Sequence, residues 1–314
     1  EQLSKNLNLI KVSSPIAILD GTGINDDLNG TERAVIFPIK SLNEQKAVIV
    51  HSLAKWKRIR LKQFEIEFNR GILTDMRALR PDENFTPQHS IYVDQWDWEI
   101  NIKSHQRNLS FLKKIVLKIY EALKTTELLL HEKYSAIIPL LPQNITFIHS
   151  EELLMLFPNL SAKERENEIC KQYGAVFIIG IGNKLSNGTE HDGRAPEYDD
   201  WSTKNEDGYI GLNGDLIVWH PVLQSAFEIS SMGIRVNKKA LLHQLTKKQC
   251  LQKRNLLYHN LLLSGQLPES IGGGIGQSRL CMFMLRKSHI GEVQVGIWEN
   301  NTMLELAKNG ITLL

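Results

Sequence analysis

The chain has 314 residues, a net charge of +2 and a charged fraction of 23%. Its length allows one large domain or two modest ones, with room for a sizeable hydrophobic core. The near-neutral charge gives no overall electrostatic signature for binding DNA or RNA, and no apolar run approaches the ~18 residues of a membrane span. We therefore expect neither a nucleic-acid partner nor a membrane partner.

The cysteines indicate the redox compartment. Cys170, Cys250 and Cys281 are far apart in the sequence and odd in number. This pattern argues against a disulfide framework and against a zinc site, and it suits a reducing compartment. We expect a cytoplasmic protein.

The N-terminal part of the chain predicts a polar helix, a short strand and a long loop. Residues 1–8 look like the continuation of a polar helix whose start is missing, and residues 9–12 form a strand that ends before a proline. Residues 20–30 are rich in turn formers. An acidic residue such as Asp26 is explained there by the turn more readily than by a site.

A strand at residues 47–50 runs directly into a basic helix. Ser52 is a candidate cap for that helix. Lys55, Lys57 and Arg58 then place three cations within four residues. Such a cluster is typical of a solvent-exposed helix face, with a functional role as the alternative.

A polar strand follows a sharp turn. Residues 79–83 predict a turn after a helix-like stretch. Alternation from Tyr92 onward predicts a strand in which Gln95, Asp97 and Glu99 share one face. Three aligned polar side chains on a tryptophan-rich strand indicate a binding surface.

The middle of the chain predicts two helices and three strands. An apolar stripe predicts a helix over residues 109–134, and a capping-box signature opens a second helix over residues 161–173. A wholly apolar strand at residues 175–181 leads into a long polar loop. Residues 215–219 and 226–235 then predict neighbouring antiparallel strands.

A glycine-rich stretch follows helical material at residues 237–263. Residues 272–279 read GGGIGQSR, with four glycines in the first five positions. A dinucleotide-binding GxGxxG pattern fails because Arg279 stands at its last glycine, and a P-loop fails because no GK[ST] follows. What remains is a glycine platform beside Arg279, suited to a flat ring or a polyphosphate.

The order of these elements predicts the fold class. Strands, helices and then a second run of strands indicate an α+β fold with a largely antiparallel sheet flanked by helices, not a βαβ alternation. No repeat or flexible linker interrupts the chain, so we expect one domain over residues 1–314.

Several blocks together resemble the catalytic domain of class II aminoacyl-tRNA synthetases. Residues 12–15 (VSSP) resemble its first, dimer-forming motif, Arg80 with residues 95–97 (QWD) the second, and residues 272–279 the third. Residues 228–235 (EISSMGIR) are similar to a segment of the aspartate and asparagine members. The resemblance implies a class II synthetase-like fold and a homodimer.

One motif departs from that pattern. The synthetases usually carry Arg-x-Glu, whereas residues 80–83 read RPDE here. The partner of the adenine amino group therefore stays open between Asp82 and Glu83.

The similarity is closer still to the ammonia-dependent asparagine synthetases, the AsnA-type aspartate–ammonia ligases, and it covers nearly the whole chain. The matching blocks are residues 51–58 (HSLAKWKR), 78–83 (ALRPDE), 93–99 (VDQWDWE), 199–202 (DDWS), 211–215 (GLNGD) and 230–235 (SSMGIR).

The resemblance implies the substrates, the metal and the reaction. ATP activates the β-carboxylate of aspartate as an adenylate and releases pyrophosphate, and ammonia then displaces AMP to give asparagine. The implied partners are aspartate, ATP and ammonia, with Mg²⁺ as the metal.

The resemblance also implies the site residues. Arg80 would bridge the substrate carboxylate and the α-phosphate, and Arg279 would stack on adenine or hold the γ-phosphate. The residues implied for aspartate are Asp26, Lys57, Arg80, Gln95, Asp97, Asp199, Ser231 and Arg235. Those implied for ATP are Arg80, Glu83, Asp215, Glu228, Gly274, Gly276 and Arg279, with Asp215 and Glu228 holding Mg²⁺. Of the acids, Asp26 and Asp199 are the candidates to take a proton from ammonium.

Two other functions fit parts of this pattern. The first is a free-standing aspartyl- or asparaginyl-tRNA synthetase core, against which the near-neutral charge and the RPDE spacing argue. The second is an inactive paralogue that serves as an amino-acid sensor, against which the intact Arg80, Glu228 and Arg279 argue.

Overall fold

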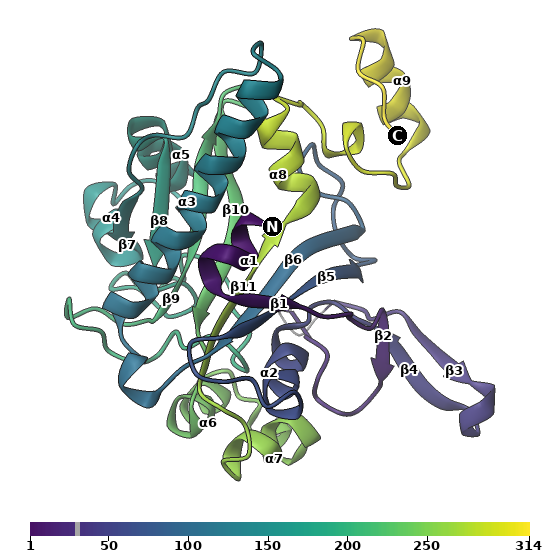
Figure 1. The fold of residues 1–314 in the computed structure, drawn as a ribbon, viewed down its shortest axis with the longest axis vertical. Coiled ribbons are helices and arrows are strands. Elements are labelled where there is room, and N and C mark those ends of the chain that lie inside the picture. The colour runs from purple at the N-terminus through teal and green to yellow at the C-terminus, as the bar shows by residue number, and fades with distance from the viewer. Residues whose placement is uncertain (29–31) are drawn as a thin grey trace.

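An eight-stranded sheet forms the centre of the computed structural model, which describes residues 1–28 and 32–314 (Figure 1). In sheet order the strands are β1 (Leu9–Lys11), β5 (Gly71–Leu79), β6 (Tyr92–Asn101), β11 (Ser270–Gly276), β10 (Ser225–Ile234), β9 (Asn213–His220), β8 (Ala175–Ile179) and β7 (Thr146–His149). In this order, each pair of neighbouring strands between β5 and β8 is antiparallel. The two edge strands are parallel to their neighbours, β1 to β5 and β7 to β8. The expected α+β fold is confirmed.

Helices cover one face of the sheet along most of its width. This face packs against α1 (Gln2–Leu7), α3 (Leu109–Lys133) and α8 (Gln277–Met284). Alternate residues of the strands, such as Trp98 and Phe227, point into this apolar layer and are fully buried. The layer forms because period-2 strands meet the apolar stripe that the sequence of α3 predicts.

The opposite face is covered only at its two ends among the described residues. Helices α4 (Ser150–Leu156) and α5 (Ala162–Tyr173) pack on β7–β9, and α5 begins with the predicted capping box. Helix α2 (Ala54–Gln63) packs near β5 and β6. The polar side of β6, β10 and β11 lies between these two groups of helices.

The basic helix α2 is buried, so the expectation of a solvent-exposed face is wrong. Lys55, Lys57 and Arg58 are each 1% exposed. The other side of α2 packs through Ile59 on α6 (Lys238–Lys247) and α7 (Leu257–Leu263). Burying a charge costs several kcal/mol unless it is paired, and the acids and carbonyls that pair these cations come from distant parts of the chain.

A second correction concerns the stretch before Arg80, which is strand β5 and not a helix. It pairs with β6 along its whole length. Because β5 is buried on both faces over most of its residues, its sequence lacks the alternation that distinguishes a half-exposed strand from a helix. Ser52 does not cap α2 as its N-cap residue, but its Oγ atom accepts a hydrogen bond from Ala54 N at 3.2 Å.

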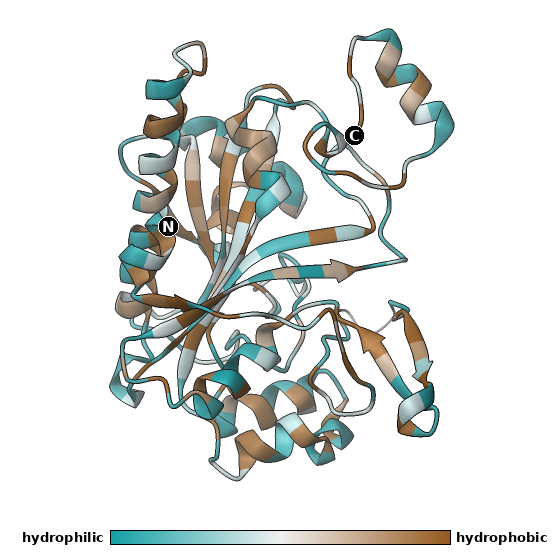
Figure 2. Ribbon diagram, turned by 45° about the vertical axis from the view of Figure 1, so that its right-hand side comes forward, coloured by the Kyte–Doolittle hydropathy of each residue, from teal (hydrophilic) through white to brown (hydrophobic). Residues whose placement is uncertain are grey.

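Two smaller units lie outside this body. A three-stranded sheet contains β2 (Ala17–Leu19), β4 (Gln45–Ile49) and β3 (Ile36–Ile39), in that order. Helix α9 (Asn300–Lys308) stands apart from the central sheet near the C-terminus (Figure 2). No described helix is long and apolar enough to cross a membrane. Residues 29 and 30 of the expected loop lie outside the described residues.

Candidate active site

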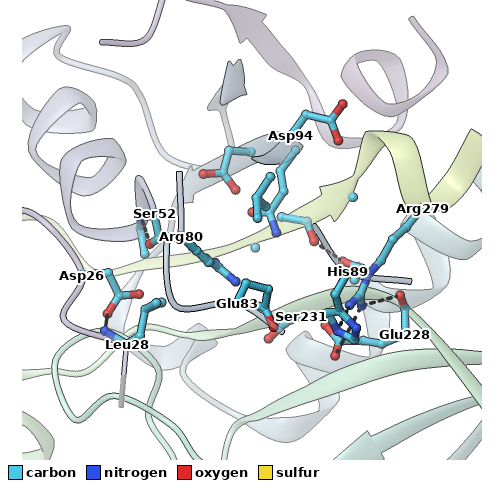
Figure 3. A pocket seen from close by; sticks show the side chains of 18 of the residues that line it. Asp26, Leu28, Ser52, Arg80, Glu83, His89, Asp94, Glu228, Ser231 and Arg279 are labelled. Atoms are coloured by element: carbon cyan, nitrogen blue, oxygen red, sulfur yellow. Dashed lines mark hydrogen bonds and ion pairs between the residues drawn. The ribbon is translucent and has the colours of Figure 1, made fainter. Parts of the chain in front are cut away.

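A cavity of about 540 Å³ opens on the polar face of β6, β10 and β11 (Figure 3). It brings together residues from parts of the chain that are far apart in sequence. The predicted residues that line it are Asp26, Lys57, Arg80, Glu83, Gln95, Asp97, Asp199, Glu228, Ser231, Arg235, Gly274, Gly276 and Arg279. Asp215 lies behind this wall, where its carboxylate binds Arg194, which itself lines the cavity.

The glycines of β11 make room for the polar side chains of β6. Gly272 pairs with Glu99, and Gly274 pairs with Asp97. A Cβ atom at position 272 would lie 1.8 Å from a carboxylate oxygen of Glu99, and one at position 274 would lie 2.5 Å from Oδ1 of Asp97. Atoms do not pack this closely, so any larger residue at either position would force these side chains to move. The role of Gly274 and Gly276 toward a nucleotide stays a prediction.

Arg235 is fixed by two buried carboxylates. Its Nη2 atom donates to Oε2 of Glu99 at 2.8 Å, and its Nη1 atom donates to Asp199. Burial raises the pKa of the Asp199 carboxyl, and the guanidinium opposes that effect. Burial also disfavours the Glu99 carboxylate, but Arg235 outweighs it and lowers the pKa of Glu99. Arg235 is therefore rigidly oriented at the cavity wall.

Lys57 and Asp97 form a second buried pair. The Nζ atom of Lys57 lies 3.2 Å from Oδ1 of Asp97 and donates to the carbonyl of Gly273 at 2.9 Å. Burial lowers the pKa of Lys57 and raises the pKa of Asp97, so the surroundings disfavour both charges. Interactions between charges are strong in this part of the cavity, because little water is present to screen them.

Tyr198 joins the site through Asp26, and sequence reasoning did not single it out. Tyr198 lies near the carboxylate of Asp26, which accepts a hydrogen bond from Leu28 N at 3.0 Å. The ring lies 5.7 Å from the guanidinium of Arg235. Burial and the nearby Asp26 carboxylate raise the pKa of Tyr198 well above its usual value, so the phenol stays protonated.

A buried cluster around Glu197 anchors this region. Its carboxylate lies 3.1 Å from Lys55 Nζ, 3.0 Å from His259 Nε2 and 3.4 Å from Lys253 Nζ. Lys253 also pairs with Asp27 at 2.6 Å. Burial alone would raise the pKa of Glu197, but Lys55, His259 and Lys253 lower it to about 2. The cluster ties the segments that carry Asp26 and Tyr198 to α2 and α7.

Arg279 lies at the opposite end of the cavity, beside His89 and Glu228. Its Nη1 atom donates to the carbonyl of Glu228 at 3.1 Å, and its Nη2 atom lies 2.7 Å from His89 Nε2. Burial and Arg279 lower the pKa of His89 to about 4, so its imidazole is neutral at neutral pH. Nε2 then accepts from Arg279, and Nδ1 donates to Oγ1 of Thr86 at 2.8 Å.

The turn after β5 separates the two candidate partners of the adenine amino group. Asp82 is paired with Arg33, whose Nε atom donates to Oδ1 at 2.7 Å. Glu83 lies beside Arg80, and both side chains line the cavity (Figure 3). The Nη2 atom of Arg80 donates to the His51 carbonyl at 3.3 Å.

A β-bulge gathers three further oxygen-bearing side chains on one face. It lies between Glu228 and Ser230 in β10, where Glu228 pairs with Ile217 and Ser231 pairs with Asp215. Residues 215 and 217 share a face, so Glu228 and Ser231 share it too, although residues three apart in a regular strand face opposite ways. The carboxylate oxygens of Asp215 and Glu228 fit a hard cation such as Mg²⁺.

Arg194 is another cavity residue that sequence reasoning left without a role. It belongs to the long loop after β8, upstream of the matching block at residues 199–202. Its Nη2 atom contacts Asp215 and the Oγ atom of Ser231, the latter at 3.0 Å. The only sequence signal for Arg194 and Tyr198 was their place in a polar loop that follows a buried strand.

Solved structures show the same fold at low sequence identity. The asparaginyl-tRNA synthetase of Pyrococcus horikoshii, solved in complex with asparaginyl-adenylate, matches 92% of this chain and 65% of its own, with 15% identity and a TM-score of 0.65. The asparaginyl-tRNA synthetase of Entamoeba histolytica matches 93% of this chain and 64% of its own, with 14% identity and a TM-score of 0.62. This chain spans just under two thirds of those synthetases. Its fold is that of a class II aminoacyl-tRNA synthetase catalytic domain.

Relatives of known family match over the full chain. An aspartate–ammonia ligase of Parabacteroides distasonis is 58% identical over 100% of this chain and 91% of its own length. Those of Bacteroides fragilis and Clostridium perfringens are 55% and 51% identical over 99% and 100% of this chain, and over 90% and 91% of their own. The aspartate–ammonia ligase family model matches residues 1–310. The chain belongs to the aspartate–ammonia ligase family.

Proposed function

We propose that this protein makes asparagine from aspartate and ammonia, with ATP as the energy source and a β-aspartyl-adenylate as the intermediate. The observation that carries the proposal is a match to ligases over the full length of this chain at 51–58% identity. All of the predicted site residues except Asp215 line its cavity. The cavity has a cationic wall of Arg80 and Arg279 for phosphates. Its buried acids Asp97 and Asp199 suit the ammonium groups.

The first step joins aspartate to the nucleotide. An oxygen of the β-carboxylate attacks the α-phosphorus of ATP, the bond from that phosphorus to the bridging oxygen breaks, and pyrophosphate leaves with the electron pair. Charge develops on the phosphate oxygens, so positioned cations supply most of the catalysis. Arg80 carries this role because its planar donor fork contacts both the carboxylate and the α-phosphate.

The second step forms the amide. Ammonium must first lose a proton, because only ammonia has a lone pair. Ammonia then attacks the β-carbonyl carbon, and the carbon–oxygen bond to the phosphate breaks with its electron pair leaving on AMP. The added nitrogen releases a second proton to solvent, which gives the neutral amide. Asp26 and Asp199 are the candidate proton acceptors. Asp199 suits this task because burial raises the pKa of its carboxyl, which makes it a better base than an exposed aspartate.

The remaining residues bind the two substrates. Gln95, Asp97, Lys57, Ser231 and Arg235 surround the aspartate, with acids for its ammonium and Arg235 for its α-carboxylate. Glu83, Gly274, Gly276 and Arg279 contact the nucleotide. Asp215 and Glu228 hold Mg²⁺, which neutralises phosphate charge when it is bound.

The expected assembly and location belong to the same proposal. Residues 12–15 resemble the dimer-forming motif of class II synthetases, so we propose a homodimer. The three cysteines are free in the structure, in agreement with the proposed cytoplasmic location.

The decisive experiment incubates the purified protein with aspartate, ATP, Mg²⁺ and an ammonium salt. We expect equal amounts of free asparagine, AMP and pyrophosphate, with no product when ammonium is left out. A parallel reaction with tRNA tests the competing function. Aspartate or asparagine transferred to tRNA, without free asparagine, would overturn the proposal, and the absence of pyrophosphate release would indicate an inactive paralogue.

A further inference from the structure

Arg194 forms an ion pair with Asp215, a carboxylate that the proposed function assigns to Mg²⁺. Its Nη2 atom binds Asp215 and lies 3.0 Å from the Oγ atom of Ser231. Its Nη1 atom donates to the carbonyl of Gly193 at 3.1 Å. The side chains of Arg194 and Asp215 are 13% and 6% exposed, so the ion pair is shielded from water at the back of the cavity.

We propose that Arg194 is an exchangeable cation of the nucleotide site: it neutralises Asp215 while no nucleotide is bound, and it yields that carboxylate when the metal–ATP complex enters. Its guanidinium then passes to the anionic groups in the cavity. The proposal rests on the proposed function for the identity of the nucleotide and the metal. It adds a residue that neither the sequence motifs nor the family resemblance assigned.

The first argument is the local concentration of negative charge. The carboxylates of Glu228 and Asp192 lie close enough to Asp215 to repel it. The Nη1 atom of Arg279 lies 3.9 Å from Oε2 of Glu228. Arg194 likewise places a positive charge beside the carboxylate of Asp215. Each of the two proposed metal ligands is thus matched by an arginine in the structure. A divalent cation at the same two acids would make one of these positive charges redundant.

The second argument is that the backbone of Arg194 is fixed while its guanidinium is incompletely bonded. Trp201 Nε1 donates to the carbonyl of Ala195 at 3.1 Å, and His191 contacts Glu166 at 3.0 Å, so the loop is anchored on both sides. The backbone of Gly182 packs closely against the start of the Arg194 side chain, since a Cβ atom at Gly182 would lie 2.6 Å from Cβ of Arg194. The Nε atom, by contrast, is buried without a hydrogen-bond partner in the described structure.

An incoming anion can accept a hydrogen bond from the unpaired Nε–H of Arg194, which lowers the free energy of the buried guanidinium. An unpaired buried N–H costs about 1–3 kcal/mol, and a carboxylate or phosphate oxygen that reaches it recovers this cost. The five donors of arginine also allow it to change partners without leaving the cavity. A lysine, with its single charged nitrogen, could balance Asp215 equally well but could not hold Asp215 and Ser231 while presenting a further donor.

Binding of Mn²⁺, a spectroscopic substitute for Mg²⁺, tests the exchange without reference to turnover. Electron paramagnetic resonance would measure the concentration of free Mn²⁺ as the protein concentration is raised, in the absence of nucleotide. Because Arg194→Met removes the competing cation from Asp215, we expect it to bind Mn²⁺ about tenfold more tightly than the unaltered protein. The same variant should need more ATP for half-maximal rate. Asp215→Asn should lose Mn²⁺ binding, and Arg194→Lys, which keeps the charge, should behave like the unaltered protein toward Mn²⁺.

Arg286→Met is the matched control. Arg286 also pairs with a buried carboxylate, that of Glu127 at 3.0 Å, but it does not line the cavity. Its replacement should leave Mn²⁺ affinity unchanged. Unchanged Mn²⁺ affinity in Arg194→Met, with a folded protein by circular dichroism, would overturn the exchange and leave a merely structural ion pair. Should Arg194→Met not fold, equal Mn²⁺ affinity of Arg194→Lys and Arg194→Gln would overturn it instead.

Failure of this inference is distinguishable from failure of the proposed function. If asparagine forms and Mn²⁺ affinity is insensitive to Arg194, only the exchange is wrong. If Mn²⁺ affinity rises in Arg194→Met and no asparagine forms, the exchange stands and the reaction is wrong.

Discussion

The Oε2 atom of Glu99 fills the space that a side chain at Gly272 would need, since a Cβ atom there would lie 1.8 Å from it. The same Cβ would lie 2.5 Å from Nη2 of Arg235, the partner of Glu99. The glycine strand is therefore shaped by a buried ion pair of the protein itself. The proposed nucleotide contact with that strand is therefore limited to the positions that those polar side chains leave open.

Gly272→Ala should damage both stability and substrate binding. The methyl group forces Glu99 or Arg235 to move, and overpacking of a buried site costs about 1–3 kcal/mol. We expect the free energy of unfolding, measured in urea, to fall by at least that amount. If Arg235 binds aspartate, the KM for aspartate should rise more than the KM for ATP.

Gly296→Ala provides the comparison. A Cβ atom at position 296 would make contacts of 3.4 Å or more, which is ordinary van der Waals distance, and its φ is not in the left-handed region. We expect a change in unfolding free energy within about 0.5 kcal/mol. Equal effects at positions 272 and 296 would contradict the steric argument.

Arg80→Ala should abolish turnover and leave the fold intact. Among the described residues the guanidinium donates to the His51 carbonyl at 3.3 Å and to no other group, so little of the described fold depends on it. Loss of a donor aimed at developing charge lowers kcat by about 100-fold or more. Pyrophosphate release measures the adenylation step, and near-UV circular dichroism checks the fold. Arg80→Lys, which keeps the charge but not the fork, should recover only part of the rate. Near-normal kcat in Arg80→Ala would refute the assigned role.

The sequence predicts the strands and helices whose patterns are local. The alternation of β6, the apolar stripe of α3 and the capping box of α5 each depend on neighbours in sequence, and the structure confirms them. Strand β5 was mistaken for a helix-like stretch because burial on both faces removes its alternation. The fold class followed from the order of the elements, and the family from several matching blocks.

What the sequence could not show are relationships that need the third dimension. The cations of α2 look solvent-exposed until the partner of Lys55 is known to be Glu197, 142 positions further along the chain. A bulge in β10 puts Glu228 and Ser231 on one face, against the period of two that a sequence pattern assumes. Arg194 and Tyr198 lie in a loop, where no periodicity indicates which side chains face the cavity.

Substitutions of Glu83 and of Asp82 should change the KM for ATP by different amounts. Asp82 also lines the cavity, but its carboxylate is paired with Arg33, whereas Glu83 lies beside Arg80. If Glu83 accepts from the adenine amino group, Glu83→Gln should raise the KM for ATP by about tenfold, since a hydrogen bond to a charged group contributes about 1.5–3 kcal/mol. Asp82→Asn, the matched change at the neighbouring position, should alter it by less than about threefold. The reverse order would assign the adenine contact to Asp82.

Glu197 should make stability depend on acid pH. The pKa of its carboxyl is about 2 in the folded protein, against about 4.3 in an unfolded chain. The unfolded chain therefore binds more protons as the pH falls from about 5 to about 2, so the free energy of unfolding falls over that window. The shift corresponds to about 3 kcal/mol, present at neutral pH and lost in acid.

Glu197→Gln tests that dependence directly. It leaves the buried Lys55 without its carboxylate, while Lys253 keeps Asp27, so we expect a loss of about 3–5 kcal/mol at pH 7. More specifically, urea titrations at several pH values should show a shallower fall in stability between pH 5 and pH 3, because the variant has no carboxyl at 197 to protonate. Glu305→Gln on the exposed face of α9 changes the net charge equally and should keep the original slope. If Glu197→Gln kept the original slope as well, the acid dependence would come from other carboxylates, such as Glu99.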